Sequence, residues 1–291
     1  MQYRPPAPVK RLRSRHEELS LHDTNTTFEA AWFVSSVEKA FQVLRTFEAR
    51  QRSLSLSEIA SASGLDKSAA QRFTYTLAAL GYLKKDRDAR RYTISPKILS
   101  LGMIYLRTDP LVARARHHLY ELNKRIDATV NLTELDDTDV IYAVRYPGRR
   151  TVTVDMVLGM RRPAFCSAGG RAILATMADG DALDILRRSD RIASTIHTKT
   201  SIRSIMSEIR LARSRGFAMT VQESTLGDIT VAASVRRADG TTTAAVNISV
   251  STSEWTVSDT EYKLGPIIRD VAQAVSESGE LHSHVGMAAG D

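Results

Sequence analysis

The sequence contains one cysteine, Cys166, among its 291 residues. A disulfide framework within the chain and a cysteine-based zinc finger are therefore excluded, because each needs more than one cysteine. No stretch approaches the roughly 18 consecutive apolar residues of a transmembrane helix, so we expect no membrane association. The first residues are basic but lack the apolar segment of a secretory signal, so the expected location is the cytoplasm.

The remaining composition is that of an ordinary globular protein. Hydrophobic residues make up 43% and charged residues 25% of the chain. These values exclude a largely disordered or fibrous chain. At about 150 residues per domain, the length predicts two domains.

Positive charge is concentrated in the first third of the chain. Residues 1–16 carry a net charge of +5 and residues 31–97 carry +6, whereas residues 17–30 carry −4. Residues 98–291 are neutral, so the first third carries the whole net charge of +7. Residues 1–30 contain three prolines and are predicted to be a basic mobile arm. A basic third on a neutral remainder predicts a polyanion-binding module, although a solvated basic face fits the charge equally well.

Residues 31–97 carry the pattern of a winged helix-turn-helix. Apolar residues at helical spacing predict a first helix; they are Val37, Ala40, Phe41, Leu44 and Phe47. Ser55 and Glu58 form a capping box that opens a second short helix, which ends at Gly64. A third helix is expected over 67–80, with Asp66 as its N-cap. Two helices of this size across a short glycine-containing turn are typical of a helix-turn-helix.

The predicted third helix has two faces. Phe73, Leu77 and Leu80 are expected to form its core stripe, because they lie on one side at 3.6 residues per turn. The opposite face is polar in its N-terminal half, where Gln71 can bind adenine and Arg72 can bind guanine or a phosphate. Any amphipathic surface helix has a polar outer face, so this pattern alone leaves the simpler interpretation open.

A basic hairpin after the third helix favours DNA binding. Strands are expected over 82–85 and 91–94, joined by a polar turn over 86–90. A hairpin in this position is typical of a wing, whose Arg and Lys side chains lie along phosphates or in a minor groove. The expected DNA contacts are Lys67, Ser68, Ala69, Gln71, Arg72, Tyr75, Arg87, Arg90 and Arg91.

Residues 98–291 are predicted to form a linker helix over 98–115, an α+β domain over 116–276 and a tail over 277–291. Helical patterns occur at 111–126, 169–178 and 201–214, and strand patterns occur at 140–146, 151–157, 229–236 and 243–250. Because these elements lack βαβ regularity, the sheet is expected to be antiparallel and flanked by helices.

A run of small residues, Ser167 to Gly170, leads directly into the helix expected at 169–178. Small side chains let a ligand approach the backbone, and free N–H groups at a helix N-terminus bind anions. The same residues are also explained by close packing of a helix on a sheet, so this feature alone leaves both interpretations open.

Sequence blocks in both halves are characteristic of one family. They are 56–60, 64–68, Arg72 and 80–83 in the first half, and Gly159, 163–164, Cys166, 170–175, 216–218, Glu223, Gly227 and 232–233 in the second. In this order and spacing, the chain resembles the IclR family of bacterial transcription regulators. The resemblance implies a GAF-like effector-binding domain over 116–276, homodimers formed through the DNA-binding halves, and often dimers of dimers. Residues 140–145, 161–164 and 245–249 are similar to the β-ketoadipate-pathway regulators, which sense aromatic acids or their ring-cleavage products.

The resemblance also implies an effector pocket for a small carboxylate. It assigns backbone amides to Ala168 and Gly169, and polar side chains to Thr220, Thr230, Asn247 and Ser249. Because Thr220 stands where many members have an acid, and Thr230 where many have Cys, we expect a less acidic pocket that suits an anion. Arg162 replaces an apolar residue of related proteins. We hypothesise that it pairs with the effector carboxylate; a surface arginine is the alternative.

Two other classes of function are considered. Cys166 could act as the nucleophile of an enzyme with His197 as its base, although a cysteine among small apolar residues more often serves packing. The histidines at 117–118 and 282–284 lack metal-ligand spacing, so we expect no metal and no cofactor. An RNA-binding module is disfavoured because no sheet motif presents exposed aromatics.

The sequence therefore predicts a regulator that binds double-stranded operator DNA. Two recognition helices of a homodimer, or of a dimer of dimers, would enter successive major grooves. A small organic acid would shift the dimer between arrangements with different half-site spacing. The sign of regulation is open, because the same geometry can block RNA polymerase or recruit it.

Overall fold

The computed structural model describes residues 32–48, 53–86, 88–149 and 156–277. The predicted arm over 1–30, the tail beyond Glu277, Arg87 and most of the strand expected over 151–157 lie outside the described residues. The chain divides into two compact units, Met1–Ile104 and Tyr105–Asp291.

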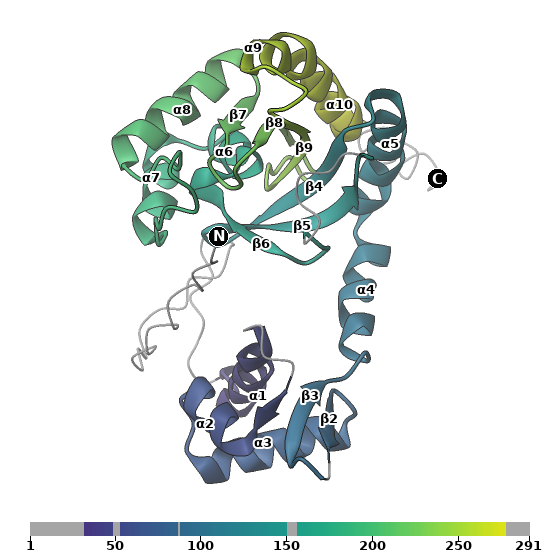
Figure 1. The fold of residues 1–291 in the computed structure, drawn as a ribbon, viewed down its shortest axis with the longest axis vertical. Helices are drawn as coiled ribbons and strands as arrows, with labels where there is room; N and C mark the ends of the chain where they lie inside the picture. Colours follow the sequence, from purple (N-terminus) through teal and green to yellow (C-terminus); the bar gives the residue numbers. More distant parts are fainter. Residues whose placement is uncertain (1–31, 49–52, 87, 150–155, 278–291) are drawn as a thin grey trace, which may run out of the picture. The chain divides into compact units, whose positions relative to one another are not determined.

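In the described part of the first unit, three helices and a small sheet precede residue 98 (Figure 1). The helices are α1 (Ser35–Arg45), α2 (Leu56–Ser63) and α3 (Lys67–Ala79), with a 3₁₀ turn at Thr46–Glu48. The strands are β1 (Leu54–Ser55), β2 (Leu83–Asp86) and β3 (Arg91–Ile94), which pair antiparallel in the order β1-β3-β2. These elements have the order of a winged helix-turn-helix.

Local capping sets the bounds of α2 and α3. The Ser55 backbone N–H donates to Glu58 Oε2 at 2.6 Å, and the Glu58 N–H donates to Ser55 Oγ at 3.3 Å. Gly64 ends α2 in the left-handed region with φ of 70°. Asp66 caps α3 by accepting a hydrogen bond from the Ala69 N–H at 2.8 Å. The predicted capping box, glycine stop and aspartate cap are all confirmed.

The core stripe of α3 differs from the prediction at one residue. Leu77 is buried and Phe73 partly so, but Leu80 is 53% exposed, because it lies at the C-cap where the chain leaves the helix. Ala70 and Thr74 are fully buried instead. Both side chains are small where α3 packs against α1 and α2, so a search for large apolar residues misses them.

The second unit is built on a six-stranded antiparallel sheet in the order β6-β5-β4-β9-β8-β7. Its strands are β4 (Thr129–Asp136), β5 (Asp139–Tyr146), β6 (Arg161–Pro163), β7 (Ala218–Val221), β8 (Asp228–Val235) and β9 (Ala244–Ser251). The α+β class and the antiparallel sheet are as predicted.

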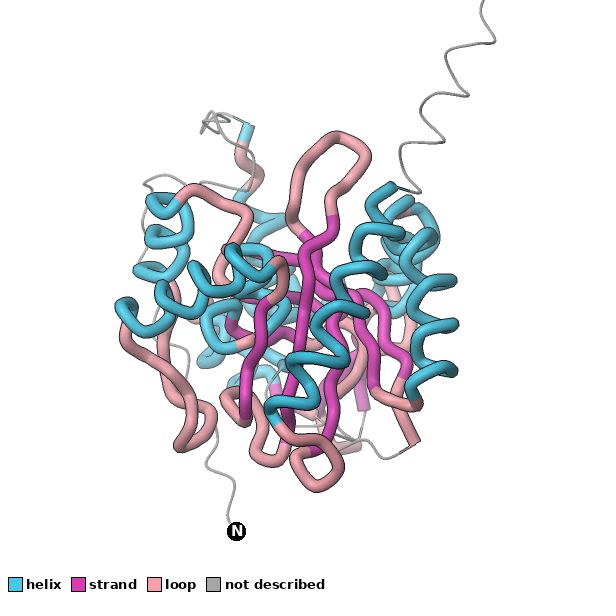
Figure 2. The backbone as a smooth tube through the Cα atoms, turned by 90° about the horizontal axis from the view of Figure 1, so that it is seen from above, coloured by secondary structure: helices cyan, strands magenta, loops and turns pink. Residues whose placement is uncertain are grey.

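Helices cover both faces of this sheet (Figure 2). The long ones are α5 (Pro110–Ile126), α7 (Asp179–Arg188), α8 (Ile202–Arg215) and α10 (Gly265–Glu277). The short ones are α6 (Ala168–Leu174), α9 (Val257–Asp259), a 3₁₀ turn at Ala164–Cys166 and a π-helical turn at Thr260–Leu264. The α5 and α10 helices lie on one face, and α6, α7 and α8 on the other.

The expected linker helix over 98–115 is not continuous. Helix α4 (Ile98–Thr108) ends before Asp109, and α5 begins at Pro110. Asp109 caps α5 by accepting from the Val112 N–H at 2.9 Å. An aspartate followed by proline favours a new helix start, because proline lacks the N–H needed inside a helix.

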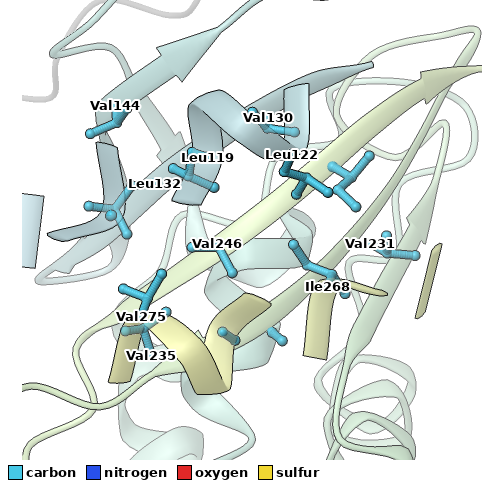
Figure 3. Packing of buried hydrophobic residues seen from close by; sticks show 14 of the residues in the cluster. Leu119, Leu122, Val130, Leu132, Val144, Val231, Val235, Val246, Ile268 and Val275 are labelled. Atoms are coloured by element: carbon cyan, nitrogen blue, oxygen red, sulfur yellow. The ribbon is translucent and has the colours of Figure 1, made fainter. Parts of the chain in front are cut away.

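The α5/α10 face of the sheet is a close-packed apolar core. Figure 3 shows Leu119 and Leu122 of α5 and Ile268 of α10 packed with strand residues such as Val130 and Val246. The core residues alternate along each strand, so their neighbours in sequence point to the opposite face. The polar residues of β4, β8 and β9 consequently gather on the α6 face, where the cavity described below lies.

An ion-pair network ties the α4–α5 junction to this sheet. Arg237 donates to Asp109 Oδ2 at 2.9 Å and also pairs with Glu134 of β4. The Tyr105 hydroxyl at the end of α4 hydrogen-bonds the same Glu134 carboxylate. We refer to Tyr105, Asp109, Glu134 and Arg237 as the junction network. Burial, followed by the hydrogen bond to the Glu134 carboxylate, raises the pKa of the Tyr105 hydroxyl well above its usual range.

Candidate functional site

Helix α3 presents the predicted recognition face to solvent. Lys67, Ser68, Gln71 and Arg72 are exposed, Tyr75 is 73% exposed, and Ala69 is partly exposed. In the described part of the chain, the side chains of Gln71 and Arg72 make no hydrogen bond or ion pair. These donors are therefore available to base edges and phosphates.

The basic side chains of the wing differ from one another in their surroundings. Arg90 is exposed in the turn between β2 and β3 with φ of 52°, and Arg87 lies outside the described residues. Lys84 and Lys85 on β2 are exposed, and the Lys85 ammonium lies 5.7 Å from the centre of the Tyr92 ring.

Arg91, predicted as a DNA contact, also forms bonds within the first unit. Its Nε donates to Ser53 Oγ at 2.9 Å, and its Nη2 donates to the Ser53 carbonyl at 2.7 Å. Nη2 also pairs with Glu58 Oε2 at 2.9 Å. Hydrogen bonds from Ser55, followed by Arg91, lower the pKa of Glu58. The guanidinium therefore fastens β3 to the start of α2, a contact that the sequence hides because Ser53 lies far away in the chain.

A cavity of about 270 Å³ lies on the α6 face of the sheet in the second unit. The six residues assigned to an effector pocket on the main helix and strands all line it; they are Ala168, Gly169, Thr220, Thr230, Asn247 and Ser249. The cavity also has polar lining residues that were not assigned from the sequence. On the strands they are Thr129, Thr133, Tyr142, Arg145, Asp228 and Ser251, and in the connecting segments they are Asp127, Arg149, Ser224, Thr225 and Glu254. The convergence of the strand residues depends on strand order, which no local pattern reveals.

A chain of buried amides orients the cavity arginine. Arg145 Nη1 donates to Asn131 Oδ1 at 3.1 Å, and Asn131 Nδ2 donates to Asn247 Oδ1 at 2.7 Å. Asn131 and Asn247 are opposite each other in the β4–β9 register and are almost completely buried. A fixed guanidinium in a desolvated cavity attracts an anion more strongly than a solvated one does.

Three acids among the described residues line the cavity, Asp127, Asp228 and Glu254, which corrects the expectation of a less acidic pocket. Thr230 Oγ1 donates to Asp228 Oδ2 at 2.7 Å and lies 2.8 Å from Ser249 Oγ. Burial raises the pKa of Asp228 to about 6, although the Thr230 hydrogen bond and the Arg162 and Arg145 charges oppose the rise. An acid is absent at Thr220, as the sequence showed, but Asp228 on the adjoining strand supplies another.

Arg162 lies beside the cavity and does not line it. On β6 it is opposite Val140 of β5, so its side chain points to the cavity face of the sheet. Its charge acts on Tyr142 and Asp228, and its buried Nε has no hydrogen-bond partner in the described part of the chain. Two other arginines, Arg145 on β5 and Arg149 in the segment after it, do line the cavity.

A buried ion pair anchors α6 next to the cavity. Arg171, fully buried, donates to Glu223 Oε1 at 2.6 Å and to Oε2 at 2.7 Å, and its Nε donates to the Phe165 carbonyl at 2.8 Å. Glu223 Oε2 also accepts the Lys199 N–H at 2.9 Å. Bidentate pairing of this kind fixes both position and orientation.

Small residues bring α6 close to the sheet. A Cβ on Gly169 would lie 2.4 Å from Thr133 Oγ1, and one on Gly170 would lie 2.4 Å from the Ala164 backbone. Close packing therefore requires both glycines, and Gly169 also lines the cavity. The two interpretations left open for this run are compatible.

Cys166 does not have the surroundings of a nucleophile. The side chain is fully buried, and burial raises the pKa of its thiol. Its Sγ lies 3.7 Å from the Pro163 carbonyl, and its own carbonyl accepts from Ser224 Oγ at 2.8 Å. His197 is exposed on another part of the unit, and no described histidine hydrogen-bonds the thiol. A thiol in this setting is mainly protonated and unreactive.

No helix among the described residues is long and apolar enough to cross a membrane. The first unit carries an exposed recognition helix, and the second a polar cavity under a helix-covered sheet. Together they define a DNA-binding transcription regulator with a small-molecule-binding domain.

Comparison with known families agrees. Residues 36–87 match the IclR helix-turn-helix domain, and residues 103–277 match the bacterial transcriptional regulator IclR C-terminal domain. The chain belongs to the IclR family of bacterial transcription regulators.

Individual relatives are similar over most of their length. The Pca regulon regulatory protein of Pseudomonas putida is 31% identical over 237 residues, which cover 81% of each chain. The p-hydroxybenzoate hydroxylase transcriptional activator of Acinetobacter baylyi is 23% identical over 90% of this chain and 97% of its own. The crystal structure of an IclR regulator from Alicyclobacillus acidocaldarius superposes with a TM-score of 0.74 at 25% identity, covering 85% of this chain and all of that one.

Proposed function

We propose that this chain is a cytoplasmic regulator that binds a pseudo-palindromic operator as a homodimer, or as a dimer of dimers, and releases or rearranges on it when a small carboxylate binds. The effector is an aromatic acid or a ring-cleavage product of one. The observation that carries the proposal is the cavity in the second unit, lined by a fixed arginine and several hydroxyl groups.

The recognition face of α3 supports the DNA-binding part. Gln71 and Arg72 reach base edges in the major groove, while Lys67, Ser68, Ala69 and Tyr75 contact the backbone around them. Arg90 in the wing turn, together with Arg87, contacts phosphates beyond the groove. Arg91 belongs to the same contact surface and also supports the wing, since its Nε and Nη2 bind Ser53 and Glu58.

Exposed apolar side chains support the homodimer. At the start of the first unit, Trp32 is 81% exposed and Val37 and Phe41 are 53% exposed. Exposed apolar residues also occur along α4; they are Leu99, Leu101, Met103 and Ile104. Apolar patches of this kind on a monomer are typical of protein–protein interfaces.

The relatives support the effector class. The two named above are regulators of a pca regulon and of p-hydroxybenzoate hydroxylase. A cavity of about 270 Å³ is at the small end of the range for ligand sites, which suits a single ring or a short chain. In this assignment Arg145 binds the ligand carboxylate, and the backbone groups of Ala168 and Gly169 lie near that carboxylate. The other polar groups of the ligand are bound by Thr220, Thr230, Asn247 and Ser249. Arg162, which lies beside the cavity without lining it, adds positive charge near the ligand.

The first experiment tests operator recognition. An operator is selected from a random-sequence duplex pool with the full chain, and its affinity is measured by fluorescence anisotropy. Arg72→Ala is expected to weaken binding about 10- to 100-fold, since a contact to a base edge is worth about 1–3 kcal/mol. Arg203→Ala, an exposed change on α8, is the matched control. Equal affinities for the two variants would contradict the assignment of α3 as recognition helix.

The second experiment tests the effector class. Thermal unfolding of the full chain is followed with benzoate, 4-hydroxybenzoate, protocatechuate and β-ketoadipate. A ligand at 100 times its Kd adds about 2.7 kcal/mol, which raises the Tm of the second unit by roughly 5–10 °C. Arg145→Met is expected to abolish the shift, and Arg162→Leu to reduce it, with operator binding retained in both. A panel without any shift would contradict the effector class and leave the DNA-binding part standing.

A further inference from the structure

The proposed effector cavity contains opposite charges that do not pair with each other. Arg145 and Asp228 both line it, and each acts electrostatically on the other, yet Asp228 forms no ion pair with any described residue. A largely desolvated carboxylate left in this way is costly unless a donor satisfies it. The lack of a donor for this carboxylate is the starting point for assigning a role to Asp228.

One oxygen of Asp228 remains open to a ligand. Oδ2 accepts the Thr230 hydroxyl at 2.7 Å, whereas no donor among the described residues reaches Oδ1. Asp228 is the first residue of β8, opposite Ser251 of β9, on the same face as Thr230 and Ser249. The open oxygen therefore belongs to the cavity wall, next to two hydroxyl groups that also face the ligand.

The surrounding charges favour a neutral donor over an ammonium group. Arg145 from β5 and Arg162 from β6 both act on Asp228, and Tyr142 from β5 is kept neutral by burial, which raises its pKa to about 12. Asp127, Arg149 and Glu254 also line the cavity, but the charges that act on Asp228 are those of the two arginines. A second cation would be repelled, while a hydroxyl can donate to the carboxylate without adding charge.

The strand positions of Arg145 and Asp228 are offset along the sheet. Arg145 is opposite Asn131 on β4, which is opposite Asn247 on β9 and then Ala232 on β8. Asp228 is four residues further along β8, a backbone offset of about 13 Å at the rise of a β-strand. The two charged groups still act on each other, so a small ligand with two separate polar groups can contact both.

We propose that Asp228 determines the specificity of the cavity by accepting a hydrogen bond from a hydroxyl group on the effector, at the end opposite the carboxylate bound by Arg145. The cavity accordingly selects hydroxylated carboxylates over the same acids without a hydroxyl. The inference rests on the proposed function, because it assumes that this cavity is the effector site.

The test compares 4-hydroxybenzoate with benzoate by isothermal titration calorimetry on the full chain at pH 8. These two probes differ only in the hydroxyl group. The wild-type chain is expected to bind 4-hydroxybenzoate about 10- to 100-fold more tightly, which is the effect of a hydrogen bond to a charged acceptor.

Two variants assign the preference to Asp228. Asp228→Leu, which cannot accept a hydrogen bond, is expected to bind both probes with affinities within about 2-fold of each other. Asp228→Asn keeps the shape of the side chain and a neutral acceptor, so an intermediate preference for 4-hydroxybenzoate is expected. If the leucine variant fails to fold, the asparagine variant provides the test. Asp270→Asn, on the exposed surface of α10, is the matched control and keeps the wild-type preference.

Each outcome separates the inference from the proposed function. Equal binding of both probes by the wild-type chain overturns the inference and leaves the effector site standing. A preference that survives in Asp228→Leu shows that another group recognises the hydroxyl, and it also overturns the inference. Failure of the wild-type chain to bind either probe overturns both, and operator binding in the same preparation confirms that the chain is folded.

Discussion

The ionised side chain of Asp228 lowers the stability of the folded state. Its pKa is raised to about 6 mainly by burial, from 3.8, so the folded state holds the proton more tightly than the unfolded state. The stabilising effect of protonation is fully present below pH 3.8 and is lost as the pH rises through about 6. Above that pH, the ionised carboxylate opposes folding unless a ligand satisfies it.

Removing this charge is expected to stabilise the free protein. In urea unfolding at pH 8, Asp228→Asn should exceed the wild-type free energy of unfolding by about 2 kcal/mol. The difference should shrink as the pH is lowered to 5, because the wild-type carboxyl becomes protonated. Asp270→Asn should show no such dependence. A constant difference at both pH values would mean that the substitution acts through packing and not through the charge.

At the scale of elements, the short helix α6 depends on one buried ion pair. Arg171→Met leaves the Glu223 carboxylate buried without its partner, and we expect the second unit to lose about 3–5 kcal/mol. The double variant Arg171→Met, Glu223→Met should recover most of this loss, because no buried charge is left unpaired.

Urea unfolding followed by circular dichroism measures both variants. The matched control is Arg210→Met, whose partner Asp179 lies on the surface; its expected cost is below about 1 kcal/mol. If the double variant were as unstable as Arg171→Met, the loss would come from side-chain packing around α6.

Elements with local signals could be predicted, and those held by distant contacts could not. The caps at Ser55, Asp66 and Gly64 each act within four residues, so the bounds of α2 and α3 followed from sequence. Several elements went unpredicted: strands β1, β4, β6 and β7 and helices α7, α9 and α10. Their sequence patterns are short or irregular, and the contacts that stabilise them come from distant parts of the chain.

The same limit applies to the cavity. Asn131 and Asn247 are 116 residues apart and hydrogen-bond directly, so no sequence window contains both. The residues assigned from the family resemblance were brought together on β7, β8, β9 and α6, with the exception of Arg162 on β6, which does not line the cavity. Arg145 and Asp228 were missed because their importance comes from the register that aligns β5, β4, β9 and β8.

At the scale of the whole molecule, the junction network offers a route from cavity to DNA. Glu134 follows Thr133, which lines the cavity, and Glu134 holds Arg237 and Tyr105 at the α4–α5 junction. A ligand that moves β4 therefore moves both side chains. We expect Arg237→Met to bind the effector within about 2-fold of the wild-type affinity while its operator affinity no longer responds to the effector.

Calorimetry measures the effector affinity of this variant, and anisotropy measures operator affinity with and without the effector. Arg187→Met on the exposed side of α7 is the control, in which the response should persist. A normal response in Arg237→Met would show that the signal leaves the second unit by another route.

The alternation of β4 has an evolutionary consequence. Odd-numbered residues from Thr129 to Thr133 face the cavity side, while Val130 and Leu132 pack in the core and Glu134 joins the junction network. Mutations that change which metabolite is sensed and mutations that change how strongly sensing is reported therefore fall at positions of different parity. One strand can thus acquire a new ligand while keeping its old output, and a lineage of such regulators can diversify its inputs one substitution at a time.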